Sequence, residues 1–210
     1  MSDLYRRPIL LGFAAALLAL TGCLPATPSA DAADAVAVVG EPAPDFTLPD
    51  TTGADFTLSA HRGSTVVLEW FNPDCPFVRY AYEDGPLAKM AQTWTDQGVV
   101  WVAVNSGKPG KQGTGAERNT KARADWKMPA PVLLDESGSV GRTFEAKTTP
   151  QIVVINPEGT LVYNGALDNR PLGKGAGEVR SYAAEVLAEV TTKGTAPYPR
   201  QKPYGCSVKY

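Results

Sequence analysis

Two short apolar runs, at residues 66–71 and 99–104, stand out against the more polar sequence around them. Each is rich in β-branched and aromatic residues and is bounded by turn-forming residues, a pattern that predicts a buried strand. Between them, apolar residues recur at helical spacing, and Gly85-Pro86 interrupts that spacing. We therefore expect a helix in two parts between the strands, because proline breaks or kinks a helix that has already begun.

Helices and strands continue to alternate beyond the second apolar run. In chain order we expect a helix over 114–126, a strand over 131–135, a short helix over 137–145, an antiparallel hairpin over 151–163, and a last helix with an apolar stripe from Val179 to Val190. Thr114 and Glu117 form a predicted capping box for the first of these helices. Another hairpin is expected over 45–58. This order of elements predicts an α/β layered fold.

The N-terminal residues have the features of an export signal. Residues 1–22 carry two arginines before an apolar stretch that is too short to span a membrane. The sequence Leu-Thr-Gly-Cys at 20–23 resembles the lipobox of bacterial lipoproteins, in which the cysteine, here Cys23, is lipidated. The alternative is an ordinary signal peptide with an incidental cysteine. Both predict export, and the first predicts a lipoprotein anchored on the periplasmic side of a bacterial membrane.

Composition divides the remaining chain into three parts. Residues 23–39 are rich in Ala, Pro, Thr, Ser and Asp and predict a flexible tether, whereas 40–194 have the length and apolar content of one domain. Residues 195–210 form a proline-rich tail that carries Cys206. The formal net charge of −2 gives no basic footprint for nucleic acid, and with a single histidine we expect no metal centre and no cofactor.

The candidate chemistry centres on Cys75, which lies where the first predicted strand ends and its helix begins. Pro76 suits the first position of a helix, because its φ is fixed and it has no N–H to lose. Free N–H groups and the positive end of the helix dipole favour a thiolate at this point. We expect Arg79 to favour the thiolate further and Asp74 to oppose it. The arrangement predicts a thiol redox enzyme.

Five segments carry a family resemblance. They are Val-Leu-Glu-Trp-Phe-Asn-Pro-Asp-Cys-Pro-Phe-Val-Arg at 67–79, Gly-Val-Val-Trp-Val-Ala-Val-Asn-Ser at 98–106, Lys-Thr-Thr-Pro-Gln at 147–151, Gly-Thr-Leu-Val-Tyr at 159–163 and Tyr-Gly-Cys-Ser-Val-Lys-Tyr at 204–210. With them the chain resembles bacterial exported redoxins related to the alkyl hydroperoxide reductase/thiol-specific antioxidant superfamily. The resemblance implies a thioredoxin-like fold, with a central mixed β-sheet flanked by helices, an N-terminal β-hairpin and an extended C-terminal tail.

The resemblance also implies roles for residues around Cys75. Thr149 and Pro150 match a Thr-Pro pair with a cis bond that faces the cysteine in this fold. The alternative is that Pro150 only begins a strand. Glu69 matches the buried acid of thioredoxins, six residues before the cysteine, which accepts a proton. The alternative is a structural residue whose carboxylate reaches the surface or an arginine. A buried carboxylate is costly unless it is paired or protonated.

The sequence departs from the related families at two motifs. Thioredoxins carry a second cysteine three residues after the first, where this chain has Val78. Peroxiredoxins carry Thr or Ser three residues before the cysteine and Pro seven before, where this chain has Asn72 and Leu68. Peroxide activation and local disulfide exchange are therefore both in question. Trp70 and Asn72 are expected to complete the surroundings of the site.

Cysteine usage leaves three possibilities for the thiols of the exported domain. If Cys23 carries lipid, Cys75 and Cys206 remain, and an exported pair is expected to be joined or exchanging. Cys206 is then the cysteine that resolves intermediates on Cys75, or the second half of a permanent clamp, or the site of an intermolecular bond.

Three functions follow from these possibilities. The first is a thiol–disulfide oxidoreductase or peroxiredoxin-like antioxidant, with Cys75 as nucleophile, a protein disulfide, thiol or hydroperoxide as substrate, and a separate reductant. The second is a non-catalytic binding lipoprotein with a structural disulfide. The third is a copper-handling protein, which requires soft ligands that two thiols and a distant histidine supply poorly.

Overall fold

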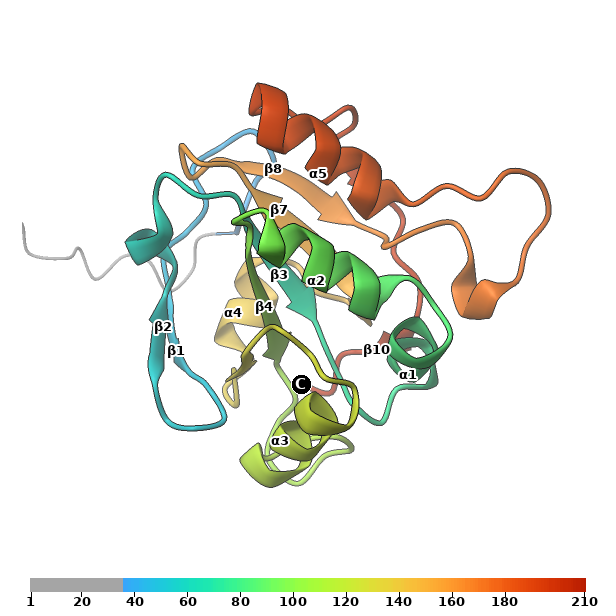
Figure 1. The fold of residues 1–210 in the computed structure, drawn as a ribbon. Helices are drawn as coiled ribbons and strands as arrows, with labels where there is room; N and C mark the ends of the chain where they lie inside the picture. Colours follow the sequence, from blue (N-terminus) through green and yellow to red (C-terminus); the bar gives the residue numbers. More distant parts are fainter. Residues whose placement is uncertain (1–35) are drawn as a thin grey trace, which may run out of the picture. The chain divides into compact units, whose positions relative to one another are not determined.

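A six-stranded mixed sheet forms the centre of residues 36–210, the part of the chain that the computed structural model describes (Figure 1). The strands, in the order in which they pair, are β5 (Val132–Leu134), β4 (Val100–Asn105), β3 (Val66–Trp70), β7 (Gln151–Ile155), β8 (Leu161–Gly165) and β9 (Arg200–Gln201). β3, β4 and β5 are parallel, β7 is antiparallel to both β3 and β8, and β9 is parallel to β8. The predicted mixed sheet is thus present, and the predicted signal peptide with Cys23 lies outside the described residues.

The central strand β3 is buried along its whole length and divides the core in two. Because side chains alternate along a strand, Val67 and Glu69 project to one face, while Leu68 and Trp70 project to the other. This continuous burial explains why the apolar run at 66–71 has no polar residue except Glu69.

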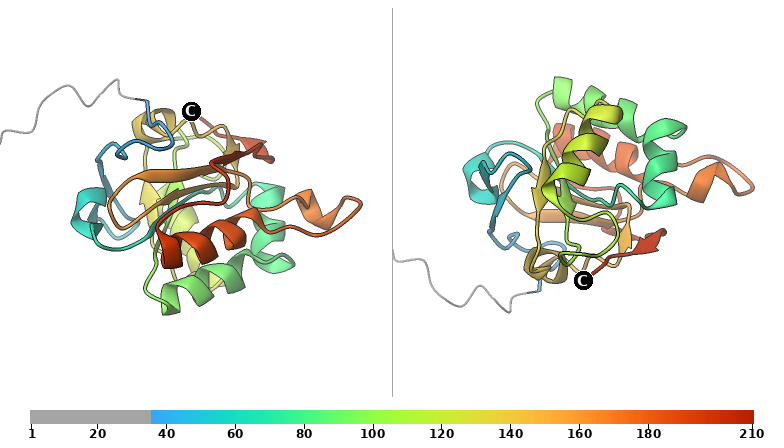
Figure 2. Two further views of the ribbon diagram at one scale, coloured as in Figure 1. Left: turned by 90° about the horizontal axis from the view of Figure 1, so that it is seen from above. Right: turned by 90° about the horizontal axis from the view of Figure 1, so that it is seen from below.

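Helices α1 (Pro76–Glu83), α2 (Leu87–Asp96) and α5 (Tyr182–Lys193) cover the face to which Val67 projects (Figures 1 and 2). Gly85 and Pro86 separate α1 from α2, as predicted. A Cβ at Gly85 would lie 2.8 Å from the Cα of Ala81, so only glycine permits the chain to turn this closely against α1. The last helix, α5, ends at Gly194, which adopts a left-handed conformation.

The opposite face is covered by α4 (Ser139–Thr143) and by the N-terminal segments. The predicted hairpin forms as β1 (Thr47–Pro49) and β2 (Asp55–Thr57), followed by the short 3-10 helix η2 (Leu58–His61). Ala37 is also buried here, and its N–H donates to the carbonyl of Thr143. The folded domain therefore includes residue 37, and the prediction of a tether as far as residue 39 extends too far.

The C-terminal tail is part of the sheet structure and is not a separate arm. β9 adds the last strand to the central sheet, and β10 (Cys206–Ser207) pairs antiparallel with β6 (Thr148–Thr149). Figure 1 shows β10 beside α1. The predicted boundary at 194/195 thus separates segments that fold together.

Two local predictions are wrong. Helix α3 (Ala116–Asp125) begins after Gly115, and the Thr114 hydroxyl donates to the Lys111 carbonyl, so no Thr-Glu capping box forms. Val179 is 69% exposed and precedes α5, in a loop that contains the 3-10 helix η3 (Pro171–Gly173), so it is not part of the apolar stripe. In both cases a residue of the loop before a helix stands at a sequence distance that also fits the helical pattern. Thr114 precedes α3 in this way, and Val179 precedes α5.

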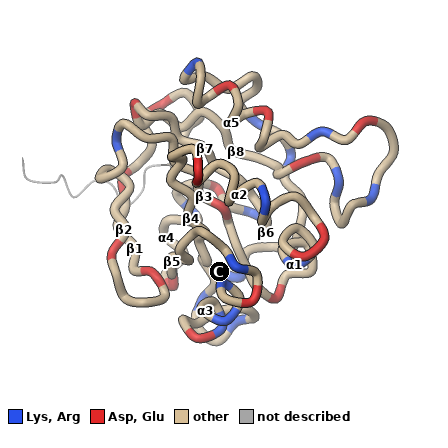
Figure 3. The backbone as a smooth tube through the Cα atoms, viewed as in Figure 1, with Lys and Arg blue, Asp and Glu red and all other residues tan. Residues whose placement is uncertain are grey.

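Acidic and basic residues are interspersed along the described backbone (Figure 3). Within residues 36–210, none of the helices combines the length and apolar character that crossing a membrane requires.

Candidate active site

Cys75 is the residue immediately before α1 and is almost fully buried. The turn that carries it is stabilised by Asn72, whose side-chain oxygen accepts from the Asp74 N–H at 2.8 Å and whose carbonyl accepts from the Cys75 N–H at 3.1 Å. Pro76 occupies the first helical position, as predicted. The strand, the turn and the helix start therefore fix the cysteine by contacts within a few residues of it.

Two distant segments meet the Cys75 thiol. The peptide bond between Thr149 and Pro150 is cis, and the Thr149 carbonyl oxygen lies 3.1 Å from the Cys75 sulfur. Cys206 pairs directly with Thr149 across β6 and β10, and its thiol lies close enough to that of Cys75 to shift the Cys75 pKa. Both cysteines are free thiols in this structure. The fold thus brings Cys75, Cys206 and the cis-proline together.

The environment shifts the pKa values of the two thiols in opposite directions, down for Cys75 and up for Cys206. Burial is the largest influence on the Cys75 pKa and raises it, but the neighbouring Cys206 thiol, the nearby Thr149 side chain and the Val78 N–H together lower it more, so the net pKa lies below its ordinary value. Burial, followed by the hydrogen bond to Cys75 and its charge, raises the pKa of Cys206 to about 11. The pair therefore favours a thiolate on Cys75 and a proton on Cys206.

The tail lies so close to the cis-proline that only glycine fits at position 205. A Cβ on Gly205 would lie 2.1 Å from the Thr149 carbonyl oxygen, and Gly205 has φ +130°. In addition, the Thr149 hydroxyl is buried and has no hydrogen-bond partner within residues 36–210. The site therefore contains a closely packed tail and one unsatisfied polar group beside the sulfur of Cys75.

Glu69 is fully buried on the same face of the sheet as Cys75. One carboxyl oxygen accepts from the Tyr82 hydroxyl at 2.8 Å and from the Trp101 indole at 3.0 Å, while the other has no partner among the described residues. Burial raises the Glu69 pKa to about 7, and the two hydrogen bonds oppose that rise. Its carboxylate reaches neither the surface nor an arginine, so it can gain or lose a proton near neutral pH.

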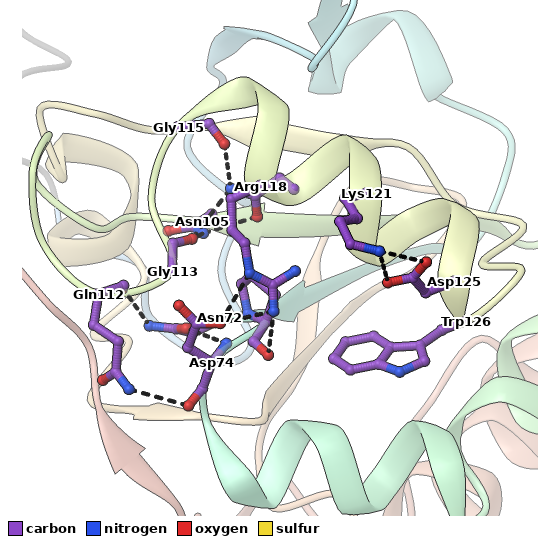
Figure 4. Close-up of polar contacts among 12 residues, drawn as sticks. Asn72, Asp74, Asn105, Gln112, Gly113, Gly115, Arg118, Lys121, Asp125 and Trp126 are labelled. Carbon is purple, nitrogen blue, oxygen red and sulfur yellow. Dashed lines mark hydrogen bonds and ion pairs between the residues drawn. The ribbon is translucent and has the colours of Figure 1, made fainter.

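The charges near the thiol differ from those expected. Arg118 of α3 binds one oxygen of the Asp74 carboxylate at 2.7 and 2.9 Å and the Pro73 carbonyl at 3.1 Å (Figure 4). The charge that we expected to oppose the thiolate is therefore largely balanced. Arg79, by contrast, is exposed, so water screens its charge. Its part in favouring the thiolate stays a prediction.

The loop at 107–115 supports the turn before Cys75 (Figure 4). The Asn72 amide donates to the Gln112 carbonyl at 3.0 Å, and the Gln112 amide donates to the Asp74 carbonyl at 3.2 Å. A Cβ on Gly113 would lie 2.0 Å from the Asn72 side-chain oxygen, so the loop needs glycine at that position. Buried Asn105 anchors the loop from β4, donating to the Gly113 carbonyl at 2.7 Å.

A surface pocket of about 590 Å³ lies beside this turn. It is lined by Pro73, Asp74, Arg79, Glu83, Arg118, Ala122, Asp125 and Trp126. The Trp126 ring stacks on Tyr82 at 5.2 Å, and Tyr82 binds the Glu69 carboxylate, so the pocket wall adjoins the buried acid.

Trp70 does not belong to the surroundings of the thiol. Its side chain lies on the other face of the sheet, where it packs against Phe144 and donates to the Ser106 hydroxyl at 3.1 Å. The alternation of β3 dictates this position, since Trp70 follows Glu69 directly. Within residues 36–210, no three His, Cys, Asp or Glu side chains gather in a way that would hold a metal ion.

Three residues of the site were not singled out from the sequence. Arg118 lies in a polar helix without any local signal that it would reach Asp74. Tyr204 and Tyr210 belong to a segment that carried the family resemblance, but nothing in the sequence assigned them a role. Their spacing around Cys206, two residues before and four after, is the one signal available.

Comparison with known proteins identifies the family to which the chain is similar. The family model described as the AhpC/TSA family matches residues 39–164, which include Cys75, Glu69 and the cis-proline but end before Cys206. The thiol-disulfide oxidoreductase ResA of Bacillus subtilis is 30% identical over 123 residues, which are 59% of this chain and 64% of that protein. The matched part of the chain thus spans less than two thirds of this relative.

Solved structures agree on the fold. The crystal structure of a hypothetical protein from Sinorhizobium meliloti 1021 matches with a TM-score of 0.71 and 30% identity, over 82% of this chain and 94% of that one. A protein from Chlorobium tepidum, assigned as a thiol:disulfide interchange protein DsbE, matches with a TM-score of 0.50 and 26% identity, over 61% and 84% of the two chains. The fold is thioredoxin-like, as predicted.

Proposed function

Because the chain belongs to the AhpC/TSA family, we propose that it is an exported thiol–disulfide oxidoreductase, with Cys75 as nucleophile and Cys206 as resolving cysteine. One observation carries the proposal: the two thiols contact each other beside the cis Thr149-Pro150 bond. The similarity to proteins named thiol-disulfide oxidoreductase and thiol:disulfide interchange protein supports it.

The reaction takes place in two exchange steps. The Cys75 thiolate attacks one sulfur of a protein disulfide, forming a mixed disulfide and releasing the other substrate sulfur as a thiolate, which takes up a proton. The Cys206 thiol then loses its proton and attacks the Cys75 sulfur, so that a Cys75–Cys206 disulfide forms and the second substrate thiolate leaves. The substrate disulfide is reduced and the protein is oxidised. A dithiol reductant restores both thiols by the same exchange, and the reverse sequence oxidises substrate dithiols.

Glu69 is proposed to exchange protons with this reaction. Its pKa of about 7 allows the carboxyl group both to accept and to donate a proton at neutral pH. Tyr82 and Trp101 hold one of its oxygens and leave the other free, so a water molecule that enters the site would find an acceptor there.

We favour disulfides over hydroperoxides as substrates. A hydroperoxide reacting at Cys75 would leave a sulfenic acid, and its activation needs hydrogen-bond donors near the sulfur. Asn72 stands where peroxiredoxins carry Thr or Ser, but its amide already donates to the Gln112 carbonyl, and its oxygen accepts from the Asp74 N–H. This side chain therefore stabilises the turn.

The proposal also places the domain outside the cytoplasm. The export signal at 1–22 and the lipobox at Cys23 support a lipid-anchored protein, whose domain faces the aqueous side of the membrane. Mass spectrometry of the mature N-terminus tests this part independently. An unlipidated chain cut at another position would contradict the anchor and leave the export intact.

The redox potential of the cysteine pair tests the enzymatic proposal. We expect a Cys75–Cys206 disulfide with a potential above about −300 mV, because a catalytic disulfide is more oxidising than a structural one. The protein is equilibrated in glutathione or dithiothreitol buffers, and its thiols are counted by mass spectrometry after alkylation. We also expect dithiol-dependent reduction of a protein disulfide, absent in Cys75→Ser and arrested at the mixed disulfide in Cys206→Ser.

Two outcomes would contradict the proposal. A potential well below −300 mV without turnover would identify the pair as a structural clamp. Two thiols that never pair under oxidising conditions would exclude both the enzyme and the clamp.

A further inference from the structure

The residues that follow Cys206 are fixed by an aromatic side chain at the end of the chain. The Tyr210 hydroxyl donates to the Ala146 carbonyl at 2.7 Å, and the Arg142 guanidinium lies 4.6 Å from the centre of its ring. Two glycines leave room for this ring. A Cβ on Gly138 would lie 2.6 Å from a ring carbon, and one on Gly141 would lie 2.5 Å from the hydroxyl.

Backbone contacts continue this docking from Tyr210 back to Cys206. The Lys108 N–H donates to the Lys209 carbonyl at 2.8 Å, and the Val208 N–H donates to the Lys147 carbonyl at 3.1 Å. These bonds connect the end of the tail to two segments that border the Cys75 site, the loop at 107–115 and the approach to β6. The tail beyond Cys206 is therefore bound along its length.

The residues before Cys206 are fixed by a second tyrosine. The Tyr204 hydroxyl donates to the Asp168 carboxylate at 2.5 Å, and this carboxylate is almost buried. The Tyr204 ring lies 6.0 Å from that of Phe77, in the first turn of α1. One tyrosine thus binds the tail near the start of α1, and the other binds it on α4.

We propose that Tyr204 and Tyr210 are positioning residues that hold the Cys206 thiol against Cys75. The inference rests on the proposed function, because positioning matters only if Cys206 resolves intermediates on Cys75. Neither tyrosine touches the reacting sulfur atoms. Each acts by restricting the segment 205–207, which raises the effective concentration of the Cys206 thiol at the Cys75 sulfur.

The test measures the second exchange step by itself. In the full chain, Cys75 is converted to its mixed disulfide with 5-thio-2-nitrobenzoate at low pH. A jump to neutral pH then starts the attack by Cys206, which forms the Cys75–Cys206 bond and releases the coloured thiolate. The first-order release rate reports the positioning of Cys206 directly, because substrate binding plays no part in it.

We expect Tyr210→Ala to slow this release on the order of tenfold and Tyr204→Phe to slow it less, since the phenylalanine keeps the ring beside Phe77. Tyr210→Phe should restore most of the rate, because the ring still fills the space beside the two glycines. Tyr198→Phe is the matched control. It lies in the same tail, but its hydroxyl binds Glu185 on α5 and not a segment next to Cys206.

The outcomes separate this inference from the proposed function. If the wild-type protein releases no thiolate in a Cys206-dependent manner, the proposed function fails. If it does, but Tyr210→Ala and Tyr204→Phe release as fast as Tyr198→Phe, the positioning role is overturned. A thermal melt of each variant identifies global unfolding. If Tyr210→Ala is unfolded, the folded pair Tyr210→Phe and Tyr204→Phe decides, and unchanged rates in both overturn the inference.

Discussion

The two cysteines of the site reach the same place by different means. Cys75 is fixed by its own strand, turn and helix, all within the continuous segment 66–83. Cys206 is fixed by β6, by the loop at 107–115 and by α4, which are all distant in the chain. The nucleophile is therefore a product of local structure, whereas its partner depends on tertiary packing.

This difference has a chemical consequence. Among the groups that lower the Cys75 pKa, the Cys206 thiol has the largest influence and the Val78 N–H of the local helix start a smaller one, while contact with Cys75 helps to raise the pKa of Cys206 to about 11. If the tail detaches from β6, the Val78 N–H still lowers the Cys75 pKa, but the Cys206 thiol no longer does. Changes to the tail should thus impair resolution and also weaken the activation of Cys75, whereas changes near Cys75 should impair activation and leave the docking of the tail intact.

Gly205→Ala should have the largest effect, because it disturbs the tail that carries Cys206. The added Cβ would collide with the Thr149 carbonyl oxygen, and the backbone at +130° strains any side chain. We expect the tail to leave β6 and the rate of Cys75–Cys206 bond formation to fall roughly 10- to 100-fold, as measured by quenched-flow alkylation and mass spectrometry.

Gly53→Ala is the control, because Gly53 also has a positive φ but meets nothing within 4 Å. It should lose similar backbone energy without affecting disulfide formation. An unchanged rate in Gly205→Ala would show that the tail can pair with β6 without this close approach.

Glu69→Gln should affect the reactivity of Cys75 and leave the docking of the tail unchanged. We expect thiol–disulfide exchange to slow about tenfold, because the amide keeps the shape of the side chain but cannot transfer a proton. The exposed Glu117 supplies the control, Glu117→Gln, which should leave the rate unchanged. Equal exchange rates for Glu69→Gln and the wild type across the pH range would make Glu69 a structural residue.

The same variant has a defined effect on stability. The Glu69 pKa is raised from 4.5 to about 7 on folding, so the unfolded chain ionises first as pH increases. The stability associated with the neutral carboxyl is present below pH 4.5 and lost as pH rises through 7, an effect of roughly 3 kcal/mol. Glu69→Gln should lack this part of the decline in urea unfolding curves measured from pH 4.5 to 8.

Arg118→Gln should have the smallest effect. It leaves the Asp74 carboxylate beside Cys75 without its cation, which raises the Cys75 pKa and slows alkylation near neutral pH by about twofold. Arg79→Gln is the comparison, and we expect it to leave the alkylation profile unchanged, because the Arg79 side chain is exposed and water screens its charge. A larger effect of Arg79→Gln would reverse this assignment.

Much of the fold was predictable because its signals are local. Burial on both faces produced the apolar run of β3, and Gly85-Pro86 produced the break between α1 and α2. The position of Cys75 before a helix followed from the turn residues and Pro76. The prediction of a capping box failed because Thr114 has the right distance in sequence from Glu117 but belongs to the loop before α3, where its hydroxyl binds the Lys111 carbonyl.

The sequence by itself determined the layered α/β fold, the place of the nucleophile and the presence of an acid in a buried strand, since alternation, helical spacing and turn chemistry are properties of adjacent residues. Only the tertiary structure decided that Arg118 balances Asp74, that Trp70 faces away from the thiol, and that two tyrosines hold the tail around Cys206. These contacts join residues far apart in the chain. Their energy depends on how the packed elements meet, so no local pattern in the sequence records them.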